Sequence, residues 1–337
     1  MAKAVKLEDI AKCLGISNVT VSKALADKSG VSEELRKKIK ELAKEMGYVP
    51  VSSQKSKPKG GTGNIGVMIP CRFVDNNNSF YWALYQQVVT QLQAKEYYAI
   101  IELISEEDEE ACRLPKMLQD GKVDGLIVIG QAATNYSRCI WEHSHVPCIF
   151  LDFYDSHREY DTIISDGFYG MYILTDYLIK KGHRKIAFVG TPLSTSSITD
   201  RFFGYQKALL ENNIPLRQDW IINDRDKSGN VFNIELPQEL PTAFACNSDY
   251  SANMVINILN EQGIHVPNDI SVVGFDNYLH PNMLNVEMTT YEVPMEKMAE
   301  LGVKTLIRKI NHKDYIKGVQ ILTGKLIIRD TVKEVMD

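Results

Sequence analysis

Apolar side chains recur along the first fifty residues at the spacing of three short helices. In residues 7–14 they fall three and four positions apart, on one face of a helix. Gly15 ends that helix, and Ser17 is a suitable N-cap for a second helix that runs to about residue 25. A third helix is predicted from Ser32 to Gly47. This order is that of a helix-turn-helix DNA-binding domain, and equally that of a generic three-helix domain.

From residue 65 onward, short apolar runs alternate with amphipathic helical segments. The alternation predicts an α/β architecture, with parallel sheets covered by helices on both faces. Two such units with a cleft between them would use the whole region. The predicted strands are 65–69, 98–103, 125–129, 148–151, 162–165, 186–190, 243–246, 271–275 and 325–329. The predicted helices are 80–95, 105–119, 167–181, 199–212, 250–262 and 294–311.

Charge divides the chain at nearly the same place. Residues 1–59 hold 13 Lys+Arg against 7 Asp+Glu, a net of +6, and the remainder holds 25 against 36, a net of −11, which sum to −5. A basic head on an acidic body is expected when only the head meets a polyanion, although a solvated basic terminus explains the charge equally well.

Composition restricts the protein class further. No run approaches the roughly 20 apolar residues of a membrane span, and the first thirty residues contain no apolar block that suits a signal peptide. The six cysteines are scattered, as in proteins whose thiols stay reduced. We therefore expect a soluble, cytoplasmic protein without membrane association.

No catalytic or metal-binding pattern stands out. The sequence lacks G-x-S-x-G, H-E-x-x-H and a spaced Cys/His cluster. Residues 61–66 spell G-x-G-x-x-G, but a basic linker precedes them and a strand follows, whereas a dinucleotide site needs the strand first and a helix afterwards. We expect no enzymatic activity, no cofactor and no metal.

The residue motifs of the first fifty positions identify a protein family more specifically than their hydrophobic periodicity does. The run LEDIAKCLGISNVTVSKALADKSGVSEELRKKIKELAKEMGYVP resembles the head of the lactose-repressor (LacI/GalR) family of bacterial transcription regulators. It follows the pattern apolar-x-D-[IV]-A-x-x-[AL]-G-[VI]-S-x-x-T-V-S-[RK], then G-V-S-x-x-[TL]-R and G-Y-x-P. Further family words extend to about residue 330: V-D-G-L-I at 123–127, G-H-R-K-I-A at 182–187, R-F-F-G-Y at 201–205 and I-S-V-V-G-F-D at 270–276.

The resemblance implies a division of the chain. A three-helix helix-turn-helix head precedes two doubly wound α/β lobes of the periplasmic-binding-protein type, between which the chain crosses three times. The expected DNA-binding domain is 1–50, followed by a basic linker or hinge at 51–64. The expected N-terminal lobe comprises 65–163 and 292–323, and the C-terminal lobe comprises 164–291 and 324–337.

The resemblance also assigns DNA contacts. Base edges in the major groove are expected to meet Asn18, Val19 and Lys23, since Asn bonds adenine, Lys contacts guanine and an apolar side chain fits the thymine methyl. Lys23 stands where arginine is common, so guanine discrimination is expected to be weaker there. The contacts to phosphates, which set the register, are expected from Lys6, the backbone of Leu7, Ser17, Thr20 and Ser22.

The linker departs from the family pattern. Most members continue after the head with a hinge helix whose leucine wedges into the minor groove and kinks the DNA. Here Lys57 takes the wedge position and no leucine is near. The plainer interpretation is a basic linker in which Lys55 and Lys57 lie along the phosphates; whether 51–57 forms a hinge helix stays open.

Between the lobes, the resemblance implies an effector site. Arg201, in the R-x-x-G-[FYW] word, should reach the ligand with its donor fork, and Asp276, after a strand, should accept hydrogen bonds from ligand hydroxyls or amines. Ser248 replaces a common asparagine and Val293 a common glutamine, so the ligand cannot be taken from any one relative. The further expected contacts are Asp152, Phe80, Tyr81, Ser248 and Asp249.

The expected function is that of a repressor that acts as a homodimer on a near-palindromic operator. A small effector, a mono- or oligosaccharide, would close the cleft and change operator affinity. A corepressor ligand such as a purine, or a partner protein, is the alternative within the family. An uptake protein would need a signal peptide and no head, and a sugar-modifying enzyme would need a catalytic constellation.

Overall fold

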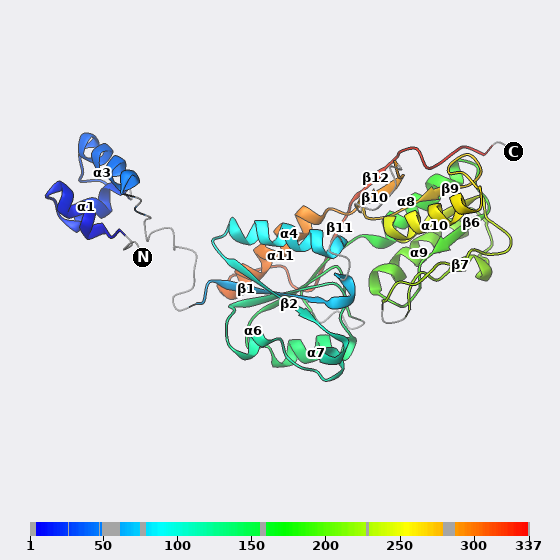
Figure 1. Cartoon of the computed structure of the whole chain (residues 1–337), viewed down its shortest axis with the longest axis horizontal. Helices are drawn as coiled ribbons and strands as arrows, with labels where there is room; N and C mark the ends of the chain where they lie inside the picture. Colours follow the sequence, from blue (N-terminus) through cyan, green and yellow to red (C-terminus); the bar gives the residue numbers. More distant parts are fainter. Residues whose placement is uncertain are drawn as a thin grey trace. The chain divides into compact units, whose positions relative to one another are not determined.

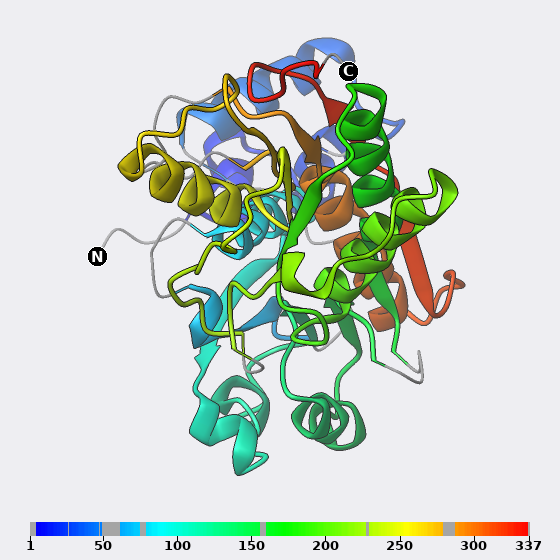
Figure 2. The same ribbon diagram turned by 90° about the vertical axis from the view of Figure 1, so that its right-hand side faces the viewer.

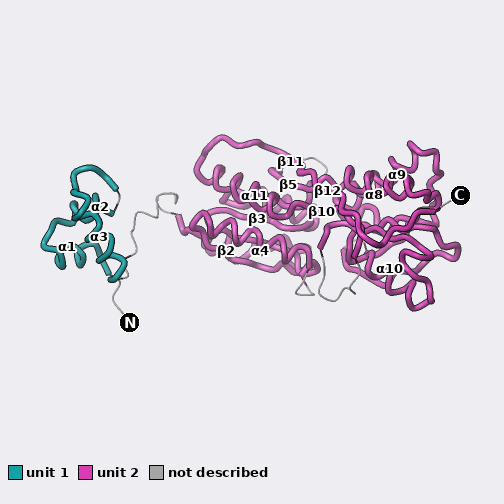
Figure 3. Tube along the Cα trace, turned by 90° about the horizontal axis from the view of Figure 1, so that it is seen from above, with its two compact units in different colours: residues 1–59 teal, residues 60–337 magenta. Residues whose placement is uncertain are grey.

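The chain forms two compact units, Met1–Lys59 and Gly60–Asp337, shown in separate colours in Figure 3. The computed structural model describes residues 5–25, 27–46, 48, 61–74, 79–155, 160–226, 229–278 and 287–335. Each unit has its own hydrophobic core, so each is treated separately below.

The smaller unit contains the three helices that the periodicity predicts. They are α1 (Leu7–Leu14), α2 (Asn18–Leu25) and α3 (Glu33–Glu45). Gly15 ends α1 with a φ of 63°, a left-handed conformation that glycine adopts without steric cost. The buried residues of this core are Ile10, Ala11, Val21, Ala24, Ile39 and Ala43.

Arg36 of α3 fixes the end of α2. Its guanidinium donates hydrogen bonds to the carbonyl oxygens of Ala24 at 3.3 Å and Lys28 at 2.8 Å, and to the carboxylate of Asp27 at 3.4 Å. The last carbonyls of a helix have no partner within the helix, so a cation there is stabilising. The last turn of α2 is thus held by a hydrogen bond from Arg36 as well as by the apolar face of the helix.

The larger unit alternates strands and helices in two lobes (Figure 1). Its first part contains β1 (Asn64–Pro70), η2 (Cys71–Phe73), α4 (Phe80–Gln93), β2 (Tyr98–Ile104), α5 (Glu106–Glu110), α6 (Lys116–Gln119), β3 (Gly125–Ile129), α7 (Thr134–His143), β4 (Cys148–Leu151) and β5 (Thr162–Ser165). There follow α8 (Gly167–Lys180), β6 (Ile186–Val189), α9 (Ser196–Glu211), η3 (Gln218–Trp220), β7 (Ile221–Ile222), β8 (Ala243–Cys246), α10 (Asp249–Glu261) and β9 (Ser271–Val273). The last elements are β10 (Thr290–Glu292), α11 (Met295–Ile310), β11 (Val319–Leu322) and β12 (Lys325–Ile327).

The N-terminal lobe is built on a parallel sheet. Among the described residues it has six strands, in the order β11-β5-β4-β3-β1-β2. Its two faces follow from strand alternation. Val67 of β1 belongs to the core under α4 and α11, whereas its neighbour Met68 packs with the residues of α6 and α7 on the opposite face. Figure 1 shows the two helix pairs on opposite faces.

The C-terminal lobe repeats this plan on a smaller sheet. In the described part of the chain its strands are ordered β7-β6-β8-β9, all parallel. Phe188 of β6 packs toward α8 and α9, and its neighbours Ala187 and Val189 pack toward α10. Helices α8 and α9 run side by side (Figures 1 and 2).

Two predicted elements were wrong. The single helix expected over 105–119 is two short helices, because Cys112 has a left-handed φ of 48° and Pro115 disfavours a helical conformation at the preceding residue. The run 325–329 was expected among the parallel strands. It instead forms β12, which pairs antiparallel with β10 as a two-stranded ribbon. Only two residues separate β12 from β11, too few for the crossover that a parallel neighbour requires.

The contact between α8 and α9 depends on Gly204. A Cβ atom at this position would lie 2.1 Å from the carbonyl oxygen of Phe168 and 2.9 Å from the amide nitrogen of Tyr172, both backbone atoms of α8. Backbone cannot move aside as the end of a flexible side chain can. The two helices therefore pack closely only because position 204 has no side chain.

We expect Gly204→Ala to lower the free energy of unfolding of the larger unit by about 2 kcal/mol or more, the usual cost of overpacking. Urea unfolding followed by tryptophan fluorescence measures this, since all three tryptophans (82, 141 and 220) lie in the larger unit. Leu210→Ala on the same helix, where the side chain is 79% exposed, is the control and should change stability little. Equal stability of the two variants would contradict the close approach.

Candidate functional site

One face of α2 is a candidate nucleic-acid surface. Asn18, Val19, Ser22 and Lys23 are exposed, and Val19 is 63% exposed although it is apolar and β-branched. On the opposite side of the helix, Val21 is buried in the core of the unit. The polar and apolar side chains that were predicted to meet base edges therefore share the outward face.

The predicted phosphate contacts surround the start of the first two helices. The hydroxyl of Ser17 accepts a hydrogen bond from the amide of Thr20 at 3.1 Å and lies 2.9 Å from its hydroxyl, which caps α2. Lys6 is exposed and its amide donates to Asp9 at 2.7 Å, while Leu7 is half-buried. Lys55 and Lys57 lie outside the described residues.

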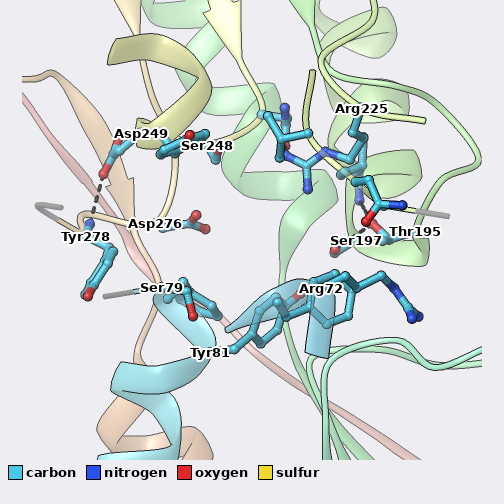
Figure 4. A pocket seen from close by; sticks show the side chains of 18 of the residues that line it. Arg72, Ser79, Tyr81, Thr195, Ser197, Arg225, Ser248, Asp249, Asp276 and Tyr278 are labelled. Carbon is cyan, nitrogen blue, oxygen red and sulfur yellow. Dashed lines mark hydrogen bonds between the residues drawn. The ribbon is translucent and has the colours of Figure 1, made fainter. Parts of the chain in front are cut away.

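A cavity of about 440 Å³ lies in the larger unit, with residues of both lobes in its wall (Figure 4). It lies at the carboxyl ends of β1, β4, β8 and β9, the edge where α/β sheets bind ligands. The structure brings all seven predicted effector contacts into this wall: Phe80, Tyr81, Asp152, Arg201, Ser248, Asp249 and Asp276.

Arg201 and Asp276 form a buried ion pair in the cavity wall. A terminal nitrogen of Arg201 donates to Asp276 at 3.1 Å, and the other donates to the carbonyl oxygen of Asn247 at 2.5 Å. The guanidinium carbon lies 3.9 Å from the centre of the Phe275 ring, a cation–π contact. The Nε atom of Arg201 is buried and has no hydrogen-bond partner among the described residues. The guanidinium is thus held rigidly, and its Nε–H has no partner among the described residues.

Asp152 faces the same cavity from the N-terminal lobe. One carboxylate oxygen accepts a hydrogen bond from the hydroxyl of Tyr81 at 3.0 Å, and the other is buried without a partner in the described part of the chain. Asp152 and Asp276 have positive φ angles of 67° and 103°, which few residues other than glycine adopt. Backbone strain of this kind clusters at ligand sites, where the surrounding structure maintains it.

Burial dominates the ionisation of these carboxyls. It raises the pKa of Asp276 to about 7, with a further increase from Asp152 and a decrease from Arg201. It raises the pKa of Asp152 to about 6, although Arg201 and the Tyr81 hydroxyl act in the opposite direction. A ligand that donates hydrogen bonds would favour the ionised forms.

Ser248 and Asp249 line the cavity, but their polar groups form hydrogen bonds with other residues of the chain. The hydroxyl of Ser248 caps α10 by accepting from the amide of Ser251 at 3.1 Å. The carboxylate of Asp249 accepts from the amide of Tyr278 at 2.9 Å and from the hydroxyl of Thr290 at 2.7 Å. These bonds fix the loops around the cavity, so both residues shape the wall more than they offer free groups.

Two arginines of the wall were missed at the sequence level. Arg72 follows β1 and pairs with buried Glu109 at 2.7 Å, and Arg225 follows β7 and pairs with buried Asp224 at 2.8 Å. The end of β1 was a recognisable signal for Arg72, because ligands bind at the carboxyl ends of parallel strands. Strand β7 has only two residues, too few for a periodicity that would have located Arg225.

Metal and membrane features are absent from the part of the chain that the structure describes. It has no group of three or more His, Cys, Asp or Glu side chains placed to hold a metal ion. Within the same described residues, no helix is long and apolar enough to cross a membrane.

Two family models match the chain. Residues 6–51 match "Bacterial regulatory proteins, lacI family", and residues 175–332 match "Periplasmic binding protein-like domain". The chain thus combines a lacI-family helix-turn-helix head with a periplasmic-binding-protein-like domain. It is a DNA-binding transcriptional regulator. The matched lacI-family segment lies in the smaller unit, and the matched periplasmic-binding-protein-like segment lies in the larger one.

Curated relatives align with nine-tenths or more of the chain. The HTH-type transcriptional repressor PurR of Vibrio campbellii is 26% identical over 97% of this chain and 98% of its own length. The PurR protein of Glaesserella parasuis is 28% identical over 90% of this chain and 89% of its own length.

Solved structures show the same fold. The Lac repressor dimer bound to operator and the anti-inducer ONPF is 23% identical, with a TM-score of 0.70 over 98% of this chain and 100% of that one. The transcriptional regulator CelR in complex with cellobiose is 20% identical, with a TM-score of 0.68 over 97% of this chain and 99% of that one.

The raised pKa values of two cavity carboxyls predict that the stability of the regulator depends on pH. With folded pKa values of about 6 and about 7 against an ordinary 3.8, Asp152 and Asp276 bind more protons in the folded state than in the unfolded state. Their contribution to the free energy of unfolding therefore falls as pH rises from about 4 to 7. His183, whose pKa burial lowers, acts in the opposite direction near pH 6.

Urea unfolding of Asp276→Asn and of the parent chain between pH 5.5 and 8 checks this effect. The amide of the substituted side chain cannot titrate, so the variant should lose part of the decline in stability that the parent chain shows with rising pH. The same decline in both chains would mean that Asp276 is already ionised across this range.

Proposed function

We propose that this regulator is a repressor that binds a near-palindromic operator as a homodimer and that a small molecule in the cavity changes its operator affinity. The observation that carries the proposal is the presence, in one chain, of a lacI-family head with an exposed α2 face and a core with a polar cavity between two lobes. We further propose that it works in the bacterial cytoplasm, where its DNA target is, and that it catalyses no reaction.

The chemistry of α2 supports specific recognition of DNA. Asn18 offers the paired donor and acceptor that adenine requires, Lys23 offers a donor for guanine, and Val19 offers an apolar surface for the thymine methyl group. Lys6, Ser17, Thr20 and Ser22, with the backbone of Leu7, are proposed to fix the register on the phosphates. Two such helices in a dimer would read half-sites about one helical turn apart.

A sugar is the effector that the cavity wall favours. A sugar hydroxyl both donates and accepts hydrogen bonds, and the wall offers both kinds of partner: the carboxylates Asp152 and Asp276, and the donor fork of Arg201. The rings of Phe73, Phe80 and Tyr81 add apolar faces on which a sugar ring can pack. Phe80, Ser248 and Asp249 are proposed to shape the site around the ligand.

A purine corepressor is the second candidate. It is favoured by the full-length curated relatives, which are PurR repressors. The tilted pair of Phe73 and Tyr81, with ring centres 4.7 Å apart, could take part in stacking a flat heterocycle. A sugar and a purine would use the same cavity, so only a ligand titration distinguishes them.

Fluorescence anisotropy tests the DNA-binding half of the proposal. The protein is titrated at fixed salt onto labelled DNA from just upstream of its own gene. We expect Asn18→Ala and Lys23→Ala to weaken binding to the operator by about 1–3 kcal/mol each, the usual worth of a base contact. Lys44→Ala, at an exposed position of a different helix, α3, is the matched control and should bind nearly as the parent does.

The same assay with added ligands tests the effector half. Release of the operator by one sugar would establish induction, and binding that appears only with a purine would establish corepression. If no small molecule changed the affinity although the operator was bound specifically, the proposed coupling between cavity and head would be wrong.

A further inference from the structure

The polar residues of the cavity wall are divided between two ends (Figure 4). Asp249, Asp276 and Tyr278 lie at one end, and Arg225, Thr195 and Ser197 lie at the other. The family words in the sequence point to the first end through Arg201 and Asp276. The second end carries a guanidinium and two hydroxyls to which no role has been assigned above.

Arg225 is held at this second end by a fully buried carboxylate. Its Nε and Nη2 atoms donate to the two oxygens of Asp224 at 3.0 and 2.8 Å. Burial raises the pKa of Asp224, but Arg225 and the hydrogen bonds that Asp224 accepts outweigh burial and hold the pKa below its usual range. A two-point contact of this kind fixes the plane of the guanidinium.

Asp224 does not depend on Arg225 for its partners. It also accepts hydrogen bonds from the amide of Thr191 at 3.1 Å, the side-chain nitrogen of Asn247 at 2.6 Å and the hydroxyl of Ser251 at 2.5 Å. A substitution of Arg225 therefore leaves this buried carboxylate solvated by three other groups, and the fold has reason to tolerate it.

Asn247 connects the two ends of the cavity. Its backbone oxygen accepts from Arg201 at 2.5 Å, and its side-chain oxygen lies 3.4 Å from Nη2 of Arg225. One residue thus fixes both guanidinium groups, and with them the spacing at which a ligand can contact both. The hydrogen bonds of the Arg225 guanidinium to the described residues run from Nε and Nη2, which leaves Nη1 as a donor for a ligand.

We propose that Arg225 determines effector specificity by donating from Nη1 to an oxygen of a second ring, so that the effector is a neutral saccharide of at least two rings. One ring is bound by Arg201 and Asp276, and the next reaches Arg225. Asp224 is the positioning residue that presents the guanidinium. This inference rests on the proposed function, because it names the ligand class of the same cavity.

The charge of the site is the reason for a neutral ligand. Among the described residues, the wall contains three arginines and three aspartates, and two further carboxylates, Glu109 and Asp224, stand directly behind Arg72 and Arg225. Burial raises the pKa of Asp276 to about 7 and that of Asp249 well above its usual range, so the positive and negative charges of the site nearly balance at neutral pH. Each arginine of the wall is already paired with a carboxylate, so an anionic ligand meets no net positive charge, whereas an uncharged sugar oxygen needs only one N–H donor.

Calorimetric titration of the full chain tests the inference. The probes are neutral disaccharides (maltose, cellobiose, lactose, sucrose and trehalose), their component monosaccharides, glucose 6-phosphate and hypoxanthine. We expect one disaccharide to bind more tightly than either of its component sugars. Arg225→Gln should weaken that disaccharide about tenfold or more, the worth of a hydrogen bond to a charged group, and leave monosaccharide affinity nearly unchanged.

Arg217→Gln is the matched control, because Arg217 lies in the same lobe and pairs with Asp219 and Glu239 outside the cavity. It should alter neither affinity. Equal weakening of both sugar classes by Arg225→Gln, no weakening at all, or preferred binding of a monosaccharide, glucose 6-phosphate or hypoxanthine would overturn the inference. Operator anisotropy is measured on the same samples, so a ligand of another class that shifts it would leave the proposed function standing.

Discussion

Arg201 and Asp276 meet at 3.1 Å inside the larger unit, where little water screens either charge. Separating such a pair by removing one partner leaves a charge buried in a medium of low dielectric, which is costly. The pair therefore constrains everything around it: Asn247 must present its carbonyl oxygen, Phe275 must present its ring face, and the chain at Asp276 must keep a strained backbone.

Further buried ion pairs surround the cavity. Each arginine of the wall has its own carboxylate: Glu109 for Arg72, Asp224 for Arg225 and Asp276 for Arg201. The guanidinium groups are thus oriented before any ligand arrives, and the ordering entropy is not lost again on binding. Asp152, whose pKa burial raises to about 6, is the acceptor that keeps an oxygen without a partner among the described residues.

The head and the core place their polar side chains differently. The head exposes polar side chains on one face of α2 and stabilises that helix from behind through Arg36 and a small apolar core. The core places its polar groups inside, between two parallel sheets. If the ligand changes operator affinity, the operator must change ligand affinity by the same factor, since binding free energies at two sites are linked reciprocally.

The sequence alone determined the α/β architecture, the three-helix head of lacI type and most strand positions, because these depend on local periodicity, helix capping and short sequence motifs. It also named seven of the residues that line the cavity. Tertiary structure alone decided that β12 pairs with β10 outside the parallel sheets, and that the polar groups of Ser248 and Asp249 form hydrogen bonds with neighbouring backbone and side chains. It alone also placed Arg225 in the cavity wall, whereas the end of β1 was a sequence signal for Arg72. These outcomes depend on which residues, far apart in the sequence, become neighbours in the two lobes that line the cavity. Local sequence patterns do not determine such contacts.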